Sequence, residues 1–373
     1  MPCSDKMTGN HTSGGLRMAN LFIPGPTDVH PEVLQAQSKP MIGHRSQTCI
    51  DLIERTQPKL RALFGTASRV FLTTCSGTGL QEASVRNCVN ERLLVCVCGA
   101  FGERWFEVAQ RNGIPAEEVT TKWGQANTPD QVEDIMKKKV FDSIAIVHNE
   151  TSTGVENPIQ AIAAAARAVN PDVIVLVDSV SAVGGVEICT DEWGLDVVFS
   201  SSQKCLALPP GMAFAAVSDR ALHKAGTVNH RGWYFDFLLY EHFLNRKLTP
   251  ATPAISLLFA LDAQLDRILD EGLENRFRRH MDLASRTQTW AREKFELYAD
   301  AGARSKTVTA VKNTVGMQIT ELNQYLSERD MMIANGYARI KDITFRIGHM
   351  GELDLPSLEI LLDLIDSYSY RST

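Results

Sequence analysis

The sequence predicts an α/β protein in which a large domain holds a mostly parallel, helix-covered sheet and a smaller α+β domain follows at the C-terminus. Between about residues 69 and 217, short apolar runs alternate with glycine-, serine- and asparagine-rich loops and with helical stretches. Several runs are apolar throughout, which is typical of strands that are buried on both faces. After about residue 253, a long helix-compatible stretch from Ile255 to Phe295, broken near Gly272, precedes shorter mixed segments and predicts the second domain.

The chain is long enough for two domains. It has 373 residues, of which 44% are hydrophobic and 22% charged, an ordinary composition for a globular protein. The first twenty residues are rich in serine, glycine and asparagine and lack the apolar stretch of a signal peptide. We therefore expect a flexible tail over residues 1–20, a large domain over 21–254 and a small domain over 255–373.

Six apolar runs define the expected strands of the large sheet, and helices are expected between them, for example over Leu80–Val89 and Ile159–Ala168. In an open α/β sheet, ligands bind outside the carboxyl ends of the strands, so the residues after each run are the functional candidates. The expected strands are Val70–Thr73, Leu93–Val97, Ile144–Val147, Val173–Val177, Val197–Phe199 and Ala213–Val217.

Charge and composition argue against several classes of partner. The chain has 38 basic and 44 acidic residues, a net charge of −6, so no nucleic-acid partner is expected. Its densest basic runs, Lys137–Lys139 and Arg276–Arg279, are predicted to be solvent-exposed helix faces. No apolar run approaches the ~18 residues of a membrane span. The eight cysteines lack zinc-site spacing, so we expect no metal and a reduced, cytoplasmic protein.

The first strand leads into a segment that suits an anion. Residues 74–79 (Thr-Cys-Ser-Gly-Thr-Gly) stand between this strand and the next helix, and a helix N-terminus offers free N–H groups and a positive dipole end. The segment is no P-loop, because no Gly-Lys-Ser/Thr follows, and Glu82 makes it a poor dinucleotide fingerprint. Taken alone, it fits a tight turn as well as a phosphate cradle.

Three later strand ends also carry distinctive residues. Phe101 lies between two glycines and is either a packed core residue or a ring presented to a flat ligand. The segment 148–154 (His-Asn-Glu-Thr-Ser-Thr-Gly) suits either a surface loop or a hydrogen-bonding cofactor wall. Asp178 ends an apolar strand, where a carboxylate is costly unless it is paired. It is therefore either a cap or salt-bridge residue, or the counter-ion of a buried cation.

Lys204 completes the set, in a short loop rich in serine, proline and glycine. A single lysine is commonly a surface residue, but at a strand end it is also a candidate nucleophile. Together these features describe the needs of pyridoxal 5′-phosphate. Its phosphate needs the helix N-terminus, and its ring needs an apolar sandwich, here Phe101 on one face and Val180 on the other. Its pyridine nitrogen needs Asp178 to stay protonated, and its aldehyde needs Lys204.

At this point the sequence resembles a known family, the class V (fold-type I) pyridoxal-phosphate-dependent aminotransferases of the alanine/serine:glyoxylate and broad-specificity aspartate type. The resemblance covers about residues 21–351, and the segments follow one another in the family's order. The segments that carry it are Pro24–Thr27, Met41–Ser46, Ser76–Gly79, Phe101–Arg104, His148–Gly154, Val177–Val180, Ser202–Lys204 and Arg346–Gly351.

The resemblance implies cofactor-binding roles for the matching residues. Lys204 would form the Schiff base with the cofactor, and Asp178 would bind the pyridine nitrogen. Thr151 would hydrogen-bond the phenolic oxygen, and Phe101 would stack on the ring. The residues implied to hold the phosphate are Ser76, Gly77, Thr78 and Gln203.

The resemblance also implies a homodimer and a substrate site. Thr252 would reach the phosphate of the neighbouring subunit, Gly25 would line the substrate site, and Arg346 would clamp the α-carboxylate, a task that suits the guanidinium fork. A dicarboxylate donor needs a second cation. His44 and Arg45 are the candidates by motif, with a purely structural role for Arg45 as the alternative.

The expected function is transfer of an amino group from alanine, serine or aspartate to a keto acid such as glyoxylate or pyruvate, with ping-pong kinetics through pyridoxamine phosphate. One alternative is a lyase or cysteine desulfurase of the same fold, but the desulfurases need a cysteine on a loop well after the lysine, and none follows Cys205. A second is a binding protein that keeps the fold without turnover. A third is a nicotinamide dehydrogenase, which the missing third glycine disfavours.

Overall fold

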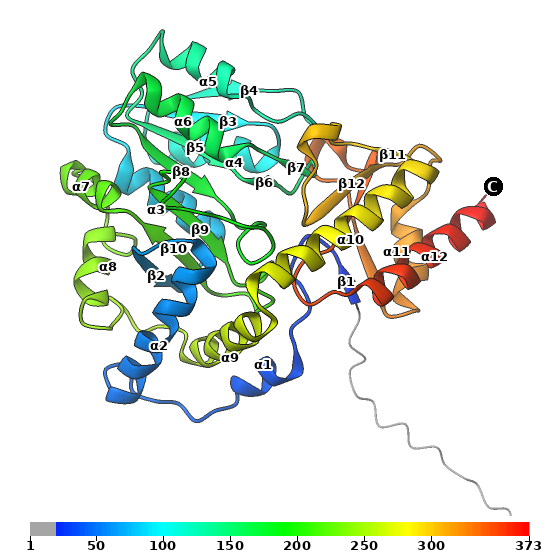
Figure 1. The fold of residues 1–373 in the computed structure, drawn as a ribbon, viewed down its shortest axis with the longest axis horizontal. Helices are drawn as coiled ribbons and strands as arrows, with labels where there is room; N and C mark the ends of the chain where they lie inside the picture. Colours follow the sequence, from blue (N-terminus) through cyan, green and yellow to red (C-terminus); the bar gives the residue numbers. More distant parts are fainter. Residues whose placement is uncertain (1–19, 373) are drawn as a thin grey trace, which may run out of the picture.

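Two sheets organise the computed structural model, which describes residues 20–372 (Figure 1). The larger sheet has seven strands in the order β2-β10-β9-β8-β5-β3-β4, all parallel except β10, which runs antiparallel to both of its neighbours. Its strands are β2 (Arg69–Thr73), β3 (Leu93–Val97), β4 (Ala116–Thr120), β5 (Ser143–Val147), β8 (Ile174–Asp178), β9 (Val197–Ser201) and β10 (Ala213–Val217).

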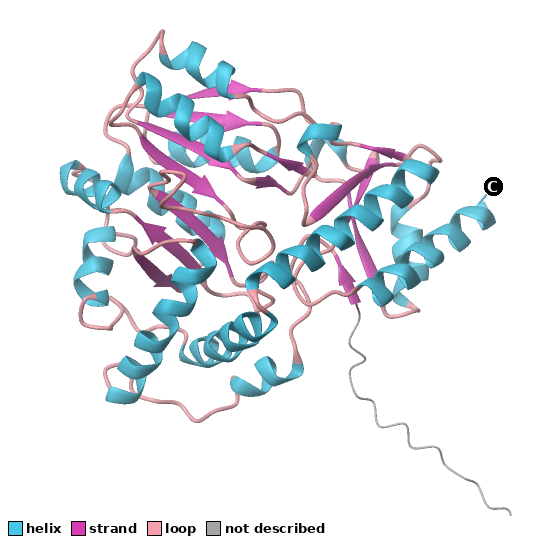
Figure 2. Ribbon diagram, viewed as in Figure 1, coloured by secondary structure: helices cyan, strands magenta, loops and turns pink. Residues whose placement is uncertain are grey.

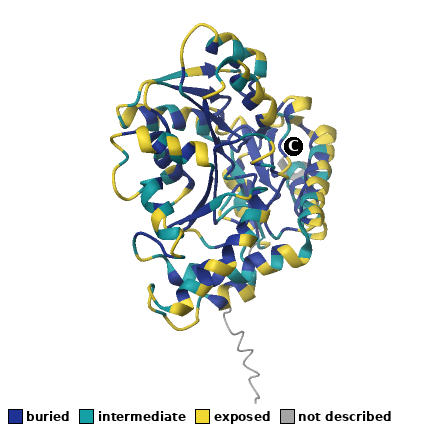
Figure 3. Ribbon diagram, turned by 60° about the vertical axis from the view of Figure 1, so that its left-hand side comes forward, coloured by how far each residue is buried: buried dark blue, intermediate teal, exposed yellow. Residues whose placement is uncertain are grey.

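Helices cover both faces of this sheet (Figure 2). One face packs against α2 (Gln47–Phe64), α5 (Pro129–Met136), α6 (Ile159–Val169) and α9 (Ile255–Glu271). The other packs against α3 (Gly77–Cys88), α4 (Ala100–Arg111), α7 (Asp219–Thr227) and α8 (Phe237–Leu244). The sheet is therefore buried on both sides, and dark blue strands fill the interior in Figure 3. This explains why its central strands are apolar throughout.

The smaller sheet has five strands in the order β1-β13-β14-β12-β11. Its strands are β1 (Asn20–Phe22), β11 (Glu296–Leu297), β12 (Val308–Lys312), β13 (Met331–Asn335) and β14 (Thr344–Gly348). The helices that share its core are α10 (Leu273–Lys294), α11 (Ile319–Ser327) and α12 (Leu355–Ser372). The remaining elements are α1 (Pro31–Ala36), the hairpin β6 (Asn149–Glu150) and β7 (Val155–Glu156), and short 3₁₀ turns at Ala301–Ala303 and Ala338–Ile340.

Two segments cross the predicted domain boundaries. The strand β1 pairs in parallel with β13, so residues 20–22 lie in the smaller sheet, beside the C-terminal strands in Figure 1. The helix α9 buries Leu258 and Leu265 in the core of the larger sheet, and only α10, after the break at Gly272, extends toward the smaller sheet. Residues 1–19, where the flexible tail was expected, lie outside the described part of the chain.

All six predicted strands are present, and the seventh, β4, was missed because it reads Ala-Glu-Glu-Val-Thr, the mixed pattern of an edge strand with one buried residue. Among residues 20–372, no helix is long and apolar enough to cross a membrane. Lys137 is exposed, as expected for its basic run, and pairs with Glu133 one helical turn away.

The second basic run, Arg276–Arg279, was predicted to be a solvent-exposed helix face, and this prediction is wrong at Arg276. This side chain is 1% exposed. Its guanidinium donates to the backbone carbonyls of Gly184 (2.9 Å) and Cys205 (2.7 Å) and pairs with Glu271 (2.7 Å) and Glu352 (3.3 Å). The charge is buried because carbonyls and carboxylates together satisfy its N–H groups, which a count of basic residues along the chain does not reveal.

Candidate active site

A cavity of about 190 Å³ lies at the carboxyl ends of the strands of the larger sheet, where the sequence places the functional loops. Loops after five strands contribute to its wall, and the predicted cofactor-binding residues of this chain meet there, with the exception of Thr252. The residues that line it are Ser76, Gly77, Thr78, Gln81, Phe101, Arg104, Val147, Asn149, Thr151, Asp178, Val180, Ser181, Ser201, Gln203 and Lys204.

The N-terminus of α3 forms one end of the cavity. The helix begins at Gly77, and the side chain of its N-cap, Ser76, makes no capping hydrogen bond, so it leaves the first N–H groups of the helix open to a ligand. A Cβ atom on Gly77 would lie 2.5 Å from a methyl group of Val180, so only glycine lets these two loops approach so closely. This end of the cavity therefore suits an anion.

Asp178 lies at the end of β8 in the floor of the cavity. One carboxylate oxygen accepts from the backbone N–H of Val180 (3.0 Å), and the other accepts from Gln81 Nε2 (3.0 Å). Burial raises the pKa of Asp178 to about 7, against these two hydrogen bonds, which lower it. Since both donors are neutral, a ligand that brings a positively charged N–H would favour the ionised carboxylate.

Lys204 follows β9 and is held against the segment around Pro24 and Gly25. Its Nζ donates to the backbone carbonyl of Pro24. Burial lowers the pKa of Lys204 to about 8, and the nearby cations Arg346 and Arg104 act in the same direction. A lysine with such a pKa is partly neutral near pH 8 and can attack a carbonyl carbon.

Gly25 allows this placement of Lys204. Its φ of +95° lies in the region that glycine adopts without a steric penalty. A Cβ atom at this position would lie 2.6 Å from Lys204 Cδ and 2.7 Å from Lys204 Nζ. Any side chain here would therefore displace the lysine.

The polar segment after β5 orients Phe101. Glu150 is fully buried and accepts from the backbone N–H groups of Phe101 (3.0 Å) and Gly102 (3.1 Å) at the start of α4. Its other oxygen accepts from the hydroxyl of Ser152 (2.5 Å). Burial raises the pKa of Glu150, and these hydrogen bonds oppose that rise. Glu150 thus fixes the turn that presents Phe101, while the Thr151 hydroxyl shares a hydrogen bond with Ser181 (2.9 Å).

Arg346 lies on β14 beside the cavity and is 8% exposed. Its Nη1 donates to the backbone carbonyl of Thr151 (3.2 Å), and its Nε donates to that of Asn335 (3.0 Å). Burial lowers the pKa of Arg346 to about 10, which still leaves it charged at pH 7. The smaller sheet therefore places a cation beside a cavity that the larger sheet builds.

Four predicted site residues do not line this cavity. Gly25 and Arg346 lie against Lys204 and Thr151, which do line it, whereas Arg45 and Thr252 lie on the surface. Arg45 is exposed, donates to the backbone carbonyl of Thr249 (3.1 Å) and stacks on Phe243 at 5.1 Å. Thr252 is exposed three residues after Thr249. The segments of Arg45 and Thr252 therefore lie together on the surface, and their predicted roles stay predictions.

Sequence reasoning missed polar residues of the cavity wall. Three of its atoms, Gln81 Oε1, Asn149 Oδ1 and Ser201 Oγ, are buried without a hydrogen-bond partner. Such atoms cost free energy unless water or a ligand satisfies them, so the wall suits a polar molecule. The sequence carries a partial signal, because Gln81 and Asn149 each belong to a motif whose other residues were recognised.

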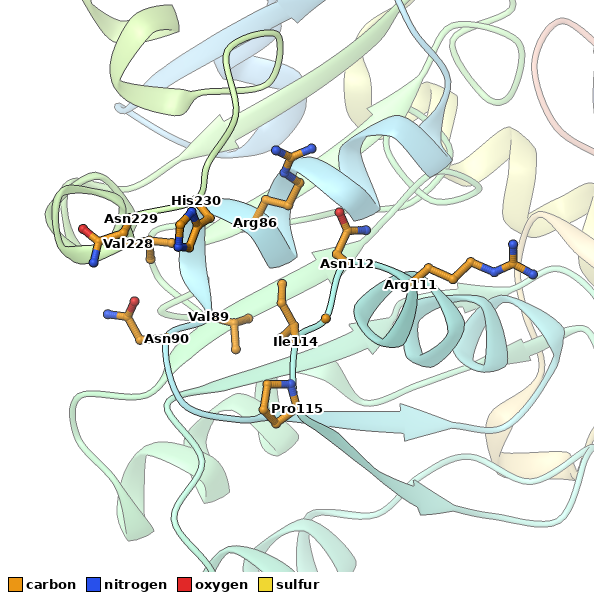
Figure 4. Close-up of a pocket in the computed structure, with 11 residues that line it drawn as sticks. Arg86, Val89, Asn90, Arg111, Asn112, Ile114, Pro115, Val228, Asn229 and His230 are labelled. Atoms are coloured by element: carbon orange, nitrogen blue, oxygen red, sulfur yellow. The ribbon is translucent and has the colours of Figure 1, made fainter.

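A larger cavity of about 550 Å³ lies elsewhere in the molecule (Figure 4). None of the residues predicted to bind the cofactor lines it. It lies beside Asn90 and Pro115, before the amino ends of β3 and β4, and therefore at the opposite edge of the sheet. Of its two arginines, Arg86 pairs with Glu82 (3.2 Å), while Arg111 pairs with Glu107 (2.7 Å) and extends away from the other labelled side chains in Figure 4.

Comparison with known proteins decides the family. The class-V aminotransferase family matches residues 20–348, nearly the whole described chain. The chain belongs to this family. The class-V aminotransferase fold accounts for both sheets, and the match spans every strand that contributes to the cavity.

Relatives agree with this assignment over nearly their full length. An uncharacterised aminotransferase of Methanocaldococcus jannaschii is 38% identical over 338 residues, covering 89% of this chain and 87% of the relative. An L-aspartate–glyoxylate aminotransferase of Paracoccus denitrificans is 32% identical, covering 89% of this chain and 86% of the relative. Among solved structures, an alanine–glyoxylate aminotransferase of a Nostoc species is 26% identical, with a TM-score of 0.89 over 98% of this chain and 99% of that one. The present chain is thus an aminotransferase of class V.

Proposed function

We propose that this aminotransferase binds pyridoxal 5′-phosphate and moves an amino group from a small amino acid, such as alanine, serine or aspartate, to a keto acid such as glyoxylate or pyruvate. The observation that supports it most is a single cavity that joins Lys204, whose pKa is lowered, to buried Asp178 and to the open N-terminus of α3. Relatives named for glyoxylate as a substrate support the choice of acceptor.

The residues of the cavity fit the cofactor on grounds of chemistry. Its wall holds three buried polar atoms without partners and a helix N-terminus without a side-chain cap, as a phosphorylated polar ring requires. Asp178 would bind the pyridine nitrogen, Thr151 the phenolic oxygen, and Phe101 and Val180 the two ring faces. The residues proposed for the phosphate are Ser76, Gly77, Thr78 and Gln203.

When bound, pyridoxal phosphate supplies a conjugated ring that withdraws the electron pair left at the substrate Cα. Lys204 would hold the aldehyde carbon covalently until the substrate amine replaces it. The released Nζ, with its low pKa, would then accept the Cα proton and deliver it to the former aldehyde carbon of the cofactor, as general base and acid. Gly25 leaves room for that movement, and Arg346 would hold the α-carboxylate in the required orientation.

The described residues give the desulfurase alternative no support. Cys205, the last cysteine of the chain, is fully buried, and burial raises its pKa to about 12. A thiol with this pKa is not a nucleophile at neutral pH. The second alternative, a binding protein of this fold, would show no turnover, so an activity assay distinguishes it from the enzyme.

We further propose a homodimer in the cytoplasm. Arg45 and Thr252 lie outside their own chain's cavity but together on the surface, so a two-fold interface would bring them to the partner's site. The seven described cysteines are free thiols, as expected in a reducing compartment. Sedimentation at assay concentrations tests the dimer, and a catalytically competent monomer would refute it.

A panel of amino donors against glyoxylate, pyruvate and 2-oxoglutarate tests the activity. We expect alanine, serine or aspartate to reduce the cofactor-loaded protein's absorbance at roughly 400–430 nm, which is typical of lysine-bound cofactor, and to yield the matching keto acid. No spectral change and no product with any donor would overturn the proposed activity.

A further inference from the structure

Tyr337 contacts two guanidinium groups beside the cavity, those of Arg104 and Arg346. The Tyr337 hydroxyl accepts from Arg104 Nη2 (3.1 Å), and the Tyr337 ring lies 5.4 Å from the guanidinium carbon of Arg346. The same ring stacks on Phe101, with 5.7 Å between the ring centres and 21° between the ring planes. Tyr337 therefore fixes Arg104 relative to the cation proposed to hold the α-carboxylate.

Arg104 lines the cavity and makes no ion pair with a carboxylate of the described residues, although it is near enough to Asp178 to lower the pKa of that carboxyl. It lines the cavity beside Lys204, its Nη1 donates to the hydroxyl of Thr78 (3.3 Å), and its guanidinium lies 4.7 Å from the centre of the Phe101 ring. No ion pair among residues 20–372 includes Arg104, whereas the adjacent Glu103 pairs outward with Arg339 (2.9 Å). Its two hydrogen bonds to side chains go to neutral hydroxyls and leave N–H groups for an anion.

Arg45, the cation predicted to bind a second substrate carboxylate, is placed differently from Arg104. Within its own chain, Arg45 lies outside the cavity and donates to the carbonyl of Thr249. Arg104 lies on the wall of the cavity itself. A guanidinium that is already oriented by Thr78, Tyr337 and Phe101 loses little entropy when it binds a planar carboxylate.

We propose that Arg104 binds the side-chain carboxylate of the substrate, so that this enzyme prefers an amino dicarboxylate to a neutral amino acid. The inference rests on the proposed function, because it assigns Arg346 to the α-carboxylate and Lys204 to the chemistry. Arg104 is then the residue that determines specificity, and Tyr337 is a positioning residue for it.

Pairs of ligands that differ by one carboxylate test the proposal. Aspartate is alanine with a carboxylate added, and succinate stands in the same relation to propionate. In Arg104→Met, kcat/KM for aspartate should fall by about 10-fold to 150-fold more than that for alanine, the range for a hydrogen bond to a charged group. Any change that Arg104 makes to the pKa of Lys204 affects both donors alike and cancels in this ratio. Arg104→Lys should give an intermediate loss, because lysine keeps the charge without the planar fork.

Calorimetric binding of succinate and propionate to the cofactor-loaded protein provides a readout that needs no turnover. Succinate should bind more tightly than propionate, and Arg104→Met should remove most of the difference. Arg339→Met is the matched control, since Arg339 is exposed, pairs with Glu103 and stacks on Trp123 outside the cavity. This control should leave both ligands unaffected.

Tyr337→Phe tests the positioning role separately, because it keeps the ring on Phe101 and removes only the hydroxyl. It should weaken aspartate and succinate by roughly 2-fold to 12-fold, the loss of one hydrogen bond, and spare alanine and propionate.

Several outcomes would overturn the proposal. An equal loss for alanine and aspartate in Arg104→Met, together with weaker binding of pyridoxal phosphate, would assign Arg104 to the cofactor phosphate. Loss of aspartate activity in Arg45→Met but not in Arg104→Met would assign the role to Arg45 at the partner's site. If no donor reacts, the proposed function fails, but the binding of succinate still decides whether Arg104 recognises a second carboxylate.

Discussion

Asp178 gives the protein a pH dependence that can be measured without turnover. Burial raises its pKa from 3.8 to about 7 in the folded protein, while an unfolded chain leaves it near the ordinary value. Between these two pH values, the folded state binds a proton that the unfolded state does not. The contribution of Asp178 to the free energy of unfolding therefore decreases as pH rises from about 4 to about 7.

Asp178→Asn removes this penalty in protein freed of cofactor. The pKa of Asp178 differs by about three units between the folded and unfolded states. This difference lowers the free energy of unfolding by roughly 4 kcal/mol above pH 7 and by roughly 2 kcal/mol at pH 5.5. The substituted amide can keep the contact in which its oxygen accepts from Val180, and a flip of the Gln81 amide lets Oε1, which has no partner, accept from the new N–H group in place of the present bond from Nε2. The variant should gain about 2 kcal/mol relative to wild type between pH 5.5 and pH 8.

Urea unfolding of both proteins at these two pH values measures the difference. Asp134→Asn, on the exposed side of α5, controls for the loss of one negative charge. A variant that is destabilised by the same amount at pH 5.5 and pH 8 would refute the reasoning, because burial would then not oppose the charge of Asp178. The same variant should bind pyridoxal phosphate more weakly than wild type does, since it cannot pair with a protonated pyridine nitrogen.

Three further predictions follow from other contacts. Arg346→Ala should lower kcat/KM for every donor by roughly 30-fold to 150-fold, because it removes the group proposed to hold the α-carboxylate, and an effect on one donor alone would contradict that role. Gly25→Ala should fold but lose at least about 100-fold in kcat, because its Cβ would occupy the space of Lys204 and displacing a reacting group by about an ångström costs a factor of that size. Near-normal turnover would show that the lysine has another position. Arg276→Met should lower the free energy of unfolding by about 3–5 kcal/mol in urea titrations, because it leaves buried carbonyls and partly buried carboxylates without their donor, and a loss under about 1 kcal/mol would show that water replaces it.

The strands were predictable because each central strand of a parallel sheet carries its signal locally, as a run of apolar residues. The site followed from the strands, since parallel strands bring their carboxyl ends to one edge, so that Asp178 and Lys204 had to lie close together. Their 26-residue separation in the sequence carries no such information without the sheet.

Contacts between distant segments could not be predicted in this way. The hydrogen bond between Arg104 and Tyr337 joins residues 233 positions apart, and neither residue has a local pattern that marks it. Arg276 reads as one of several arginines on a polar helix, and its burial depends on carbonyls from Gly184 and Cys205. The pairing of β1 with β13 likewise depends on an edge of the small sheet that no local run of residues specifies.

Borohydride reduction followed by peptide mass spectrometry tests the central assignment most directly. The purified protein should carry one phosphopyridoxyl group per chain, fixed on Lys204, because this lysine combines a lowered pKa with a place beside Asp178 and the N-terminus of α3. Lys204→Ala should remain folded and carry no fixed label. A label on another lysine of the wild-type protein, or none after incubation with pyridoxal phosphate, would contradict the assignment of this cavity as the active site.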